Sequence, residues 1–310
     1  MTNASAPQLR VYGGSIRKKL RWVEEDNKLW SAFNPSIAMN PEGQIAMAIR
    51  SSNYLLGPMQ LYTSLTTGQD IINHVWFARL DGELNITSMN KLKVVGELSF
   101  KRGIEDARLF WRDGAWHMTA VILEHGHTPV ARLGLFRIDT ETMTALFIEK
   151  YEGPDKKRVE KNWSVVAGES VPEFDLVYGP NAIYKNGKVK QLKAAGKYKN
   201  LRGGTQLIPW ENGYLSVWHI TRKKETKVFN SRTFSNESPA LRDYTHVFVK
   251  HAKDGSIEKV SEEFIFGSGA VEFAAGLVQI KDKIVISWGH DDAWSWLATI
   301  PVKSVQQMLR

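Results

Sequence analysis

The chain has 310 residues, of which 43% are hydrophobic and 24% charged, a balance typical of a globular protein that can bury a large core. It contains no cysteine, which excludes disulfides and thiolate metal sites. The net charge of +8 indicates an anionic partner or substrate group, and nucleic acid, phosphate and nucleotide-sugar all fit that charge.

No stretch approaches the roughly 20 apolar residues that span a bilayer, and the first ten residues, "MTNASAPQLR", contain no apolar signal segment. We therefore expect a cytoplasmic protein with no membrane partner. Residues 1–12 are expected to form a flexible N-terminus, and residues 13–310 a single domain.

Turn signals recur along most of the chain between apolar runs that alternate or carry aromatic residues, a pattern typical of strands. The clearest strand runs are 44–50, 75–80, 115–121, 214–220, 245–251 and 283–288. The turns lie at Glu42-Gly43, Asp81-Gly82, Asp113-Gly114, Asn186-Gly187, Asn212-Gly213, Asp254-Gly255 and Asp282-Lys283, with weaker signals at Gly168-Glu169 and Asp139–Glu141. Helical periodicity is scarce apart from a short segment at 304–309. The sequence predicts an all-β chain of consecutive hairpins.

The turns sort into two alternating sets. One set falls near residues 43, 114, 168, 213 and 282, and the other near 82, 140, 187 and 255. This alternation predicts four-stranded units, each with one inner and one outer hairpin, repeated five times around an axis. We therefore predict a five-bladed β-propeller with a short C-terminal helix. A large β-sandwich is the structural alternative.

A polar signature precedes each turn of the first set by seven to ten residues. The signatures are "FNPSIA" (33–38), "GIEDARLF" (103–110), "EKNWSVV" (160–166), "LRGGTQL" (201–207) and "AVEFAAGL" (270–277). If each opens the innermost strand of its blade, all five face one end of the central axis, and the next strand returns to that same end. One site would then hold Asn34, Arg50, Asp106, Lys161, His219, Glu272 and Asp292.

Each of these residues also has an ordinary explanation when it is taken alone. Asn34 precedes a proline and can be a turn residue, His219 can be a core histidine, and Arg108 can be a structural partner of Asp106. Most of the 11 tryptophans are expected to lie in the core, although tryptophan also stacks on sugars and bases. Equivalent positions in five blades favour function, because fold stability does not require polar groups at the same end of every blade.

Carboxylates beside basic and aromatic side chains suit acid-catalysed cleavage of a C–O bond in a sugar substrate. Asp106 is the predicted general acid, since the adjacent Glu105 and an apolar surround would raise the pKa of Asp106. The base would be Glu272 or Asp292, and Lys161, His219 and Arg50 can instead bind an anion. Whether Glu105 tunes Asp106 or merely neighbours it stays open.

Other motif searches are negative. The chain contains no P-loop, dinucleotide-binding glycine motif, HExxH or GxSxG, so no cofactor is expected. The segment "EHGH" (124–127) places a glutamate close to two histidines, but a metal site would need further ligands. We therefore expect no metal.

The signatures resemble those of five-bladed β-propeller carbohydrate enzymes, especially glycoside hydrolase family 130, over about residues 33–309. That family includes mannoside phosphorylases and β-1,2-mannosidases, and related propellers are mannosyltransferases. The family's "EDPR" is matched by "EDAR" at 105–108, which implies that Asp106 is a general acid. The resemblance also implies sugar contacts for one set of residues, Asn34, Arg50, Tyr244 and Asp292, and phosphate contacts for another, Lys161 and His219. Neighbours within the same motifs, Glu105, Arg108, Asn162 and Asp291, complete the expected binding set.

The chain departs from the family pattern at two places, of which the first is tolerable and the second weakens the case for phosphorolysis. Ala107 replaces the family's proline, and the place of a phosphorylase arginine reads "VYGPN" (177–181). We expect a glycoside hydrolase acting with inversion. The alternatives are a glycosyltransferase or phosphorylase that moves a sugar to or from a phosphate, nucleotide, sugar or nucleic-acid acceptor, and a non-catalytic propeller that binds saccharide or nucleic acid.

Overall fold

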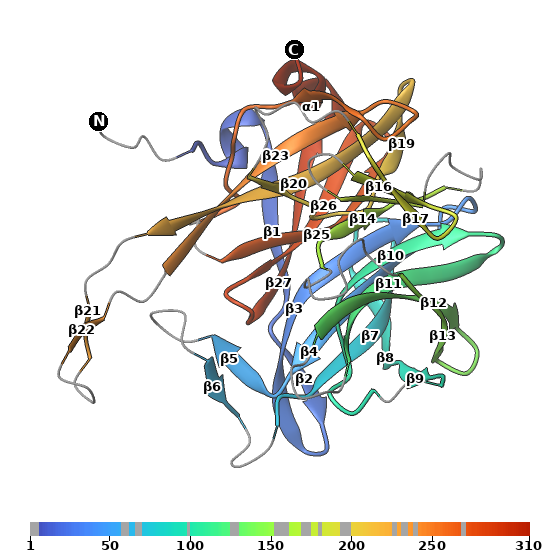
Figure 1. Cartoon of the computed structure of the whole chain (residues 1–310), viewed down its shortest axis with the longest axis vertical. Coiled ribbons are helices and arrows are strands. Elements are labelled where there is room, and N and C mark those ends of the chain that lie inside the picture. The colour runs from blue at the N-terminus through green and yellow to red at the C-terminus, as the bar shows by residue number, and fades with distance from the viewer. Residues whose placement is uncertain are drawn as a thin grey trace.

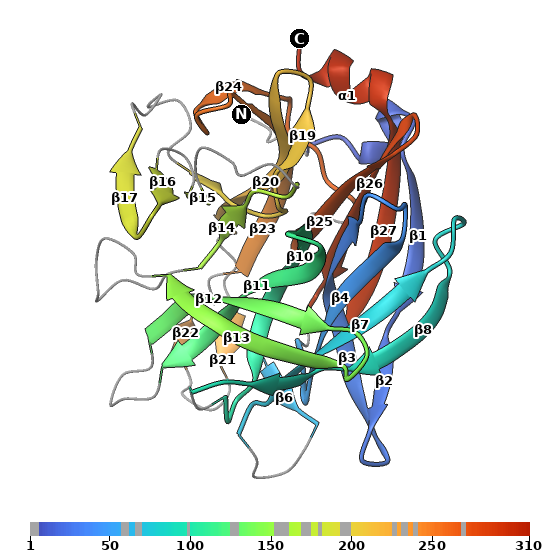
Figure 2. The ribbon, with the colours of Figure 1, turned by 90° about the vertical axis from the view of Figure 1, so that its right-hand side faces the viewer.

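The computed structural model is a five-bladed β-propeller with one C-terminal helix, as the sequence predicts. Figures 1 and 2 show the blades arranged around a central axis. The structure describes residues 6–56, 62–65, 70–97, 100–124, 130–151, 161–168, 175–178, 182–192, 200–224, 228–230, 235–237, 241–267 and 271–310. Across these residues, no helix is long and apolar enough to cross a membrane.

Each blade is a mainly antiparallel sheet with an inner and an outer pair of strands. The first blade comprises β2 (Trp22–Glu25), β3 (Lys28–Met39), β4 (Ile45–Ser52), β7 (Asn73–Leu80) and β8 (Ile86–Lys91). The second comprises β10 (Ile104–Arg112), β11 (Ala115–Glu124), β12 (Val130–Asp139) and β13 (Thr144–Tyr151), with β9 (Lys93–Val95) parallel to β13. The third comprises β14 (Trp163–Val165), β15 (Leu176–Tyr178), β16 (Ala182–Lys185) and β17 (Lys188–Gln191).

The fourth and fifth blades complete the ring. The fourth has β18 (Leu201–Arg202) and β19 (Ile208–Trp210) on β20 (Gly213–Lys224), followed by β23 (Leu241–His251) and β24 (Ile257–Val260). The fifth has β25 (Glu272–Ile280), β26 (Lys283–His290), β27 (Trp294–Pro301) and, from the other end of the chain, β1 (Ser15–Leu20). Because β1 pairs with β27, hydrogen bonds between the two ends of the chain close the propeller.

Two short hairpins stand outside the blades, β5 (Tyr54–Leu56) with β6 (Tyr62–Ser64) and β21 (Val228–Asn230) with β22 (Ser235–Glu237). They lie on the same side of the molecule in Figure 1.

The predicted turns connect the expected strands; Gly114, for example, has a φ of 69°, which suits the β10–β11 turn. The weaker signal at Gly168-Glu169 runs into residues outside the described ranges.

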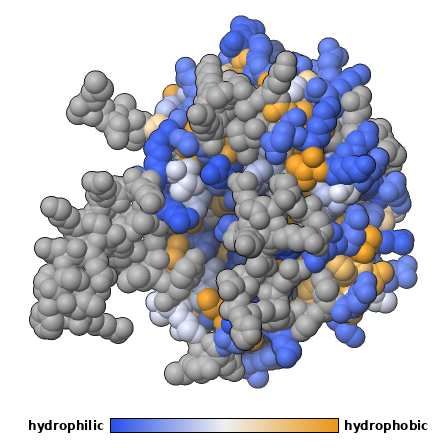
Figure 3. Space-filling view, in the orientation of Figure 1, coloured by the Kyte–Doolittle hydropathy of each residue, from blue (hydrophilic) through white to orange (hydrophobic). Residues whose placement is uncertain are grey.

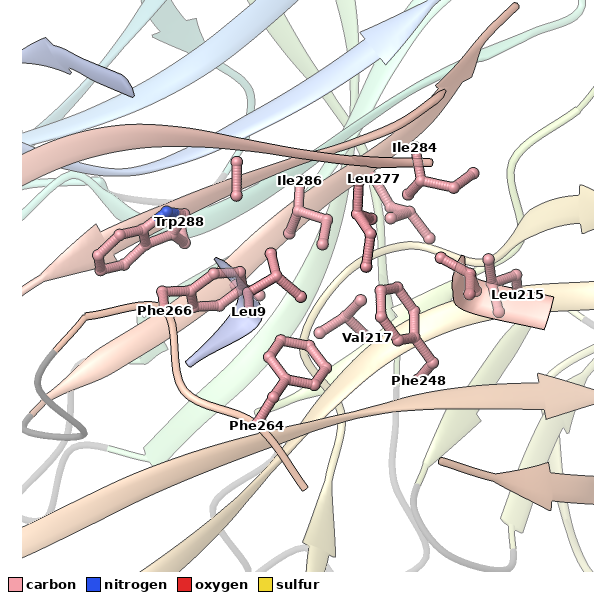
Figure 4. Packing of buried hydrophobic residues seen from close by; sticks show 14 of the residues in the cluster. Leu9, Leu215, Val217, Phe248, Phe264, Phe266, Leu277, Ile284, Ile286 and Trp288 are labelled. Atoms are coloured by element: carbon pink, nitrogen blue, oxygen red, sulfur yellow. The ribbon is translucent and has the colours of Figure 1, made fainter. Parts of the chain in front are cut away.

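Apolar side chains fill the spaces between neighbouring blades. Between the fourth and fifth, Val217 of β20 and Phe248 of β23 lie in one buried cluster with Leu277 of β25 and Ile286 of β26 (Figure 4). Burial of each such side chain contributes about 1.5–3 kcal/mol. Hydrophilic residues cover most of the described surface in Figure 3, and hydrophobic ones form small separate groups.

Part of the N-terminal segment that the sequence analysis expects to be flexible packs against this core. Leu9, in the 3-10 helix η1 (Leu9–Tyr12), is fully buried, and its N–H donates to the Ile265 carbonyl at 2.8 Å. At the other end of the chain, α1 (Val302–Met308) buries Val305 in the same cluster. Both ends of the chain therefore contribute to the junction of the fourth and fifth blades.

Candidate active site

Three neighbouring blades carry an Asn or Asp in the left-handed backbone region, within β3 and β10 and directly before β14. Asn34, Asp106 and Asn162 have φ values of 47°, 49° and 64°. Asn and Asp tolerate this region better than most residues with side chains. The strand register shifts beside Asn34 and Asp106, so a β-bulge turns each side chain away from the regular alternation. Three of the five polar signatures thus share a left-handed residue, and a bulge redirects the side chain in two of them.

Asp106 joins the first two blades through hydrogen bonds. Its Oδ1 accepts from Nδ2 of Asn34 and from Nη1 of Arg50, both at 2.9 Å. A Cβ on Gly289 would lie 2.0 Å from the Asn34 side-chain oxygen, so β26 approaches this loop closely only because residue 289 is glycine. Asn34, Arg50 and Asp106 are therefore fixed relative to one another and to the fifth blade.

Arg50 is buried, and each nitrogen of its guanidinium has a partner. Nε donates to Oδ1 of Asn73 at 2.9 Å, and Nη2 donates to the Tyr54 hydroxyl at 3.2 Å. Nη2 also pairs with Oε1 of Glu105 at 3.2 Å. No sequence motif marks Asn73 or Tyr54, and each is recognisable in the sequence only as a polar residue near the end of a strand.

Tyr54 extends the network to the fifth blade. Its hydroxyl accepts from Arg50 and donates to Oδ2 of Asp292 at 3.0 Å. Asp292 follows β26 in a turn whose two aspartates, Asp291 and Asp292, have φ values of 50° and 46°. Three blades thus bring Asp106, Arg50 and Asp292 into one hydrogen-bonded cluster, which we call the carboxylate cluster: Asn34, Arg50, Tyr54, Asn73, Glu105, Asp106 and Asp292.

The pKa of Asp106 is shifted in the direction opposite to the sequence-based expectation. Burial acts to raise this pKa, but the positive charges of Arg50 and Arg108, with the hydrogen bond from Asn34, outweigh burial and lower it to about 2. The expected increase from Glu105 and an apolar surround was wrong, because the guanidinium of Arg50, brought in by the fold, acts together with that of Arg108, two positions along the chain. Asp106 is a carboxylate at neutral pH.

Asp292 shifts the other way. Burial raises its pKa to about 6; the Arg50 charge opposes this shift, and the negative charge of Asp106 adds to it. Asp292 can therefore hold a proton in mildly acidic solution while Asp106 stays ionised. Two carboxyl groups in one cluster with separated pKa values are the usual arrangement of an acid and a base in catalysis.

Glu272 and Asp291 occupy different surroundings from Asp292. Glu272 is fully buried, and its two oxygens accept backbone N–H groups from Phe266 and Gly267 at 2.9 and 2.8 Å. These bonds anchor the segment that leads into β25. The side chain of Asp291 is 40% exposed, and its Oδ2 lies 3.6 Å from Nε2 of His290. Asp291 therefore faces the solvent rather than the carboxylate cluster. Asp292 is linked to Asp106 by hydrogen bonds that run through Tyr54 and Arg50.

A second group of residues, mostly basic, lies next to the carboxylate cluster. Arg108 is fully buried; its Nε donates to the Gly204 carbonyl at 3.0 Å and its Nη1 to the Asp106 carbonyl at 2.7 Å. Within the described residues, Nη2 of Arg108 and Nδ1 of His219 are buried without a hydrogen-bond partner. The imidazole of His219 stacks on Tyr244, with ring centroids 5.3 Å apart.

The surroundings of His219 are electropositive. Burial lowers the pKa of His219 well below 6.5, and His246, Arg108, Arg202 and Lys161 lower it further. Lys161 is exposed. The next residue, Asn162, approaches Gly203 so closely that a Cβ on Gly203 would lie 2.2 Å from the Asn162 carbonyl oxygen. We call this group the cationic cluster: Arg108, Lys161, Arg202, His219 and Tyr244.

The structure thus brings the predicted residues into two adjoining clusters linked by Asp106 and Arg108. Asn162 lies beside the cationic cluster, whereas Glu272 is bound to backbone amides and Asp291 points toward His290. His125 and His127, the histidines of the weak metal motif, lie outside the described residues. The described residues contain no group of three or more His, Cys, Asp or Glu side chains that could hold a metal ion.

No family model matches the chain, and no curated protein matches it. Solved structures with a similar fold include a β-1,2-mannobiose phosphorylase from Listeria innocua, with 13% identity, a TM-score of 0.60, and coverage of 93% of this chain and 95% of that one. Another comes from work on the GH130 family of mannoside phosphorylases, containing glycoside hydrolases that target β-1,2 mannosidic linkages in Candida mannan (12% identity, TM-score 0.59, coverage 98% and 96%). A third is a GDP-Man-dependent mannosyltransferase from Leishmania mexicana (10% identity, TM-score 0.51, coverage 88% and 85%). At these identities the likeness shows the five-bladed fold.

Proposed function

We propose that this protein is a carbohydrate-active enzyme that acts on a glycosidic bond with inversion. The observation that carries the proposal is the pair Asp106 and Asp292, two carboxyl groups in one hydrogen-bonded cluster with pKa values of about 2 and about 6. Mannosides are the first substrates to test, because similar folds include mannoside phosphorylases and a mannosyltransferase.

The opposite directions of the two pKa shifts support an assignment of roles. Asp292 carries the proton and donates it to the leaving glycosidic oxygen as the C–O bond breaks. Asp106 accepts a proton from the water that forms the new C–O bond on the opposite face of the sugar. This assignment moves the general acid from Asp106, the sequence-based prediction, to Asp292. Arg50 and Asn34 hold the Asp106 carboxylate in position.

The test is hydrolysis of mannobiose and mannotriose substrates of defined linkage by the wild-type chain, Asp106→Asn and Asp292→Asn. We expect release of mannose of inverted configuration by the wild type, detected by NMR immediately after mixing, and little release by either variant. Asp291→Asn is the matched control and should retain activity. Equal activity in all four proteins would contradict the proposal and leave a non-catalytic saccharide-binding propeller.

A second candidate function is transfer of a sugar to or from an anionic group. It is favoured by the cationic cluster, in which buried nitrogens of Arg108 and His219 lack partners within the described residues. A phosphate oxygen would supply the missing acceptors. A mannose phosphorylase from Leishmania mexicana with a similar fold was solved in complex with a phosphate ion.

Added phosphate and GDP-mannose separate the two functions. A hydrolase cleaves its glycoside at the same rate with or without either compound. A phosphorylase requires phosphate and releases mannose 1-phosphate, and a transferase consumes GDP-mannose. Cleavage indifferent to both compounds would remove the second candidate.

A further inference from the structure

A second set of cations lies on the fifth blade, at the same end of the strands as Asp292. The guanidinium of Arg21 stacks on two indoles, 4.7 Å from the ring centroid of Trp22 and 4.1 Å from that of Trp294. Nζ of Lys18 lies 3.7 Å from the centroid of Trp294. Trp294 is therefore in contact with two positive charges.

Neither cation is neutralised by the part of the chain that the structure describes. Within those residues, Arg21 and Lys18 have no carboxylate within ion-pair distance and no side-chain hydrogen bond. Nε of Arg21 is buried without a partner. The neighbouring cations of the same basic run have hydrogen-bond partners: Arg17 donates to Asn85 at 2.7 Å, and Lys19 donates to the Leu84 carbonyl. In the described part of the chain, the two cations of this run without a polar partner are therefore those on the indoles.

The chain topology places Arg21 and Trp294 at the same end of the fifth blade as Asp292 of the carboxylate cluster. Trp294 opens β27 two residues after Asp292. Leu20, at the end of β1, pairs with Ser295, and β1 and β27 run side by side in Figure 1. Arg21 and Trp22 then carry the chain from the fifth blade into the first, where the Arg21 carbonyl accepts from the Ala32 N–H at 2.8 Å, two residues before Asn34.

Stacking on an indole fixes the plane of a guanidinium and leaves the N–H groups at its edge available. A fixed planar fork binds carboxylate or phosphate oxygens in pairs, and indoles also pack against sugar rings. We propose that Arg21, Lys18, Trp22 and Trp294 form a subsite for an anionic group on the substrate, so that the enzyme acts on acidic oligosaccharides bearing a uronate carboxylate or a phosphate ester. This inference rests on the proposed function and adds the substrate class.

The alternative role of these side chains is packing alone, in which the Arg21 and Lys18 stems cover the indoles and bind nothing. Arg21→Met separates the two roles, because methionine keeps the apolar contact and removes the charge. Lys18→Met does the same for the second cation. Lys283→Met is the matched control, since Lys283 is an exposed lysine at the opposite end of the same blade.

The experiment measures binding by calorimetry for the wild-type chain and the three variants. The probes are a neutral mannose oligosaccharide, an oligomannuronate of the same length, a phosphorylated mannose oligosaccharide, and inorganic phosphate alone. We expect at least one acidic probe to bind about tenfold more tightly than the neutral one, as charge-assisted hydrogen bonds would give. Arg21→Met should lose this preference, Lys18→Met should reduce it, and Lys283→Met should keep it.

Equal affinity of the wild type for neutral and acidic oligosaccharides would overturn the inference, and so would an acidic preference that survives in Arg21→Met. Binding of inorganic phosphate without preference for either acidic oligosaccharide would also overturn it. Melting temperatures of all variants check that each is folded. The result is independent of turnover: an acidic preference without glycoside cleavage would reject only the proposed function, and cleavage without an acidic preference would reject only this inference.

Discussion

The two adjoining clusters differ in how their charges are compensated. In the carboxylate cluster, Arg50 uses all its guanidinium nitrogens and Asp106 accepts from two side chains. In the cationic cluster, Arg108 and His219 are equally buried, yet each has a nitrogen without a partner within the described residues. Burying a charge or polar group without a partner costs free energy. The charges of Arg50 and Asp106 are paired within the protein itself, whereas an anionic ligand would supply the missing partners of Arg108 and His219.

The largest expected effect concerns the proton on Asp292. Asp292→Asn removes the proposed proton donor and should lower kcat about 10²–10⁴-fold. In the wild type, kcat/KM should fall as the pH rises through about 6, because Asp292 then loses its proton. The pH profile of kcat/KM measures this directly. Asp291→Asn, in the adjacent position, should keep both the rate and the profile, and an unchanged profile in Asp292→Asn would contradict the assignment.

The next effect tests how the opposite charges of Arg50 and Asp106 compensate each other within the carboxylate cluster. Arg50→Met leaves the Asp106 carboxylate buried without its main partner and should lower the free energy of unfolding by about 3–5 kcal/mol in urea titrations. The double variant Arg50→Met with Asp106→Asn should be less destabilised than Arg50→Met alone, since both charges are then absent. Arg137→Met, at an exposed position of β12, should change stability by no more than about 0.5 kcal/mol. Additive effects in the double variant would show that the two residues are not coupled.

The third effect is the pH dependence of stability, where the two aspartates act in opposite directions. The folded-state pKa of Asp292 is raised from 3.8 to about 6, so its contribution to stability is present below about pH 4 and is lost as the pH rises through 6. Asp292→Asn should therefore stabilise the fold at pH 7, by about 1–3 kcal/mol relative to wild type. The folded-state pKa of Asp106 is lowered from 3.8 to about 2, so its contribution is lost as the pH falls from about 4 through 2. Urea titrations between pH 2 and 8 test both signs, and a wild type as stable at pH 7 as Asp292→Asn would contradict the first.

The smallest effect tests whether the cationic cluster takes an anion. Phosphate should raise the melting temperature of the wild type, because a ligand that binds only the folded state stabilises it. Lys161→Met removes an exposed charge near His219 and should reduce this stabilisation by about 1 kcal/mol or less. Lys93→Met, an exposed position in β9, should leave the phosphate effect unchanged. An equal phosphate shift in all three proteins would exclude Lys161 from the anion site.

Local sequence determined much of the fold. Two-residue turns such as Asp113-Gly114 specify hairpins through their own backbone preferences, and alternating apolar residues specify the faces of the strands. Their spacing was sufficient to predict five blades, and the structure confirms both the blades and the C-terminal helix. The packing of Leu9 was not predictable, because its partner, Ile265, lies more than 250 positions away.

The sequence was less informative about the site. It selected Asn34, Arg50, Asp106 and Asp292, and the structure brings these four into one cluster. It missed Tyr54 and Asn73, whose importance comes from their contacts with Arg50, Asp292 and Glu105. No local pattern marks a residue that holds another residue in place.

The direction of the pKa shift of Asp106 could not be predicted from its neighbours in the sequence. Its nearest neighbour in the chain, Glu105, predicted a raised pKa, whereas Arg50 lies 56 positions away and lowers it. Residue types and turn chemistry act over a few positions, so the sequence by itself determined the hairpins, the blades and the polar signatures. Electrostatic interactions depend on distance in space, so only the tertiary structure decided that Asp106 is ionised, that Asp292 can carry the proton, and that Arg21 and Lys18 have no carboxylate partner among the described residues.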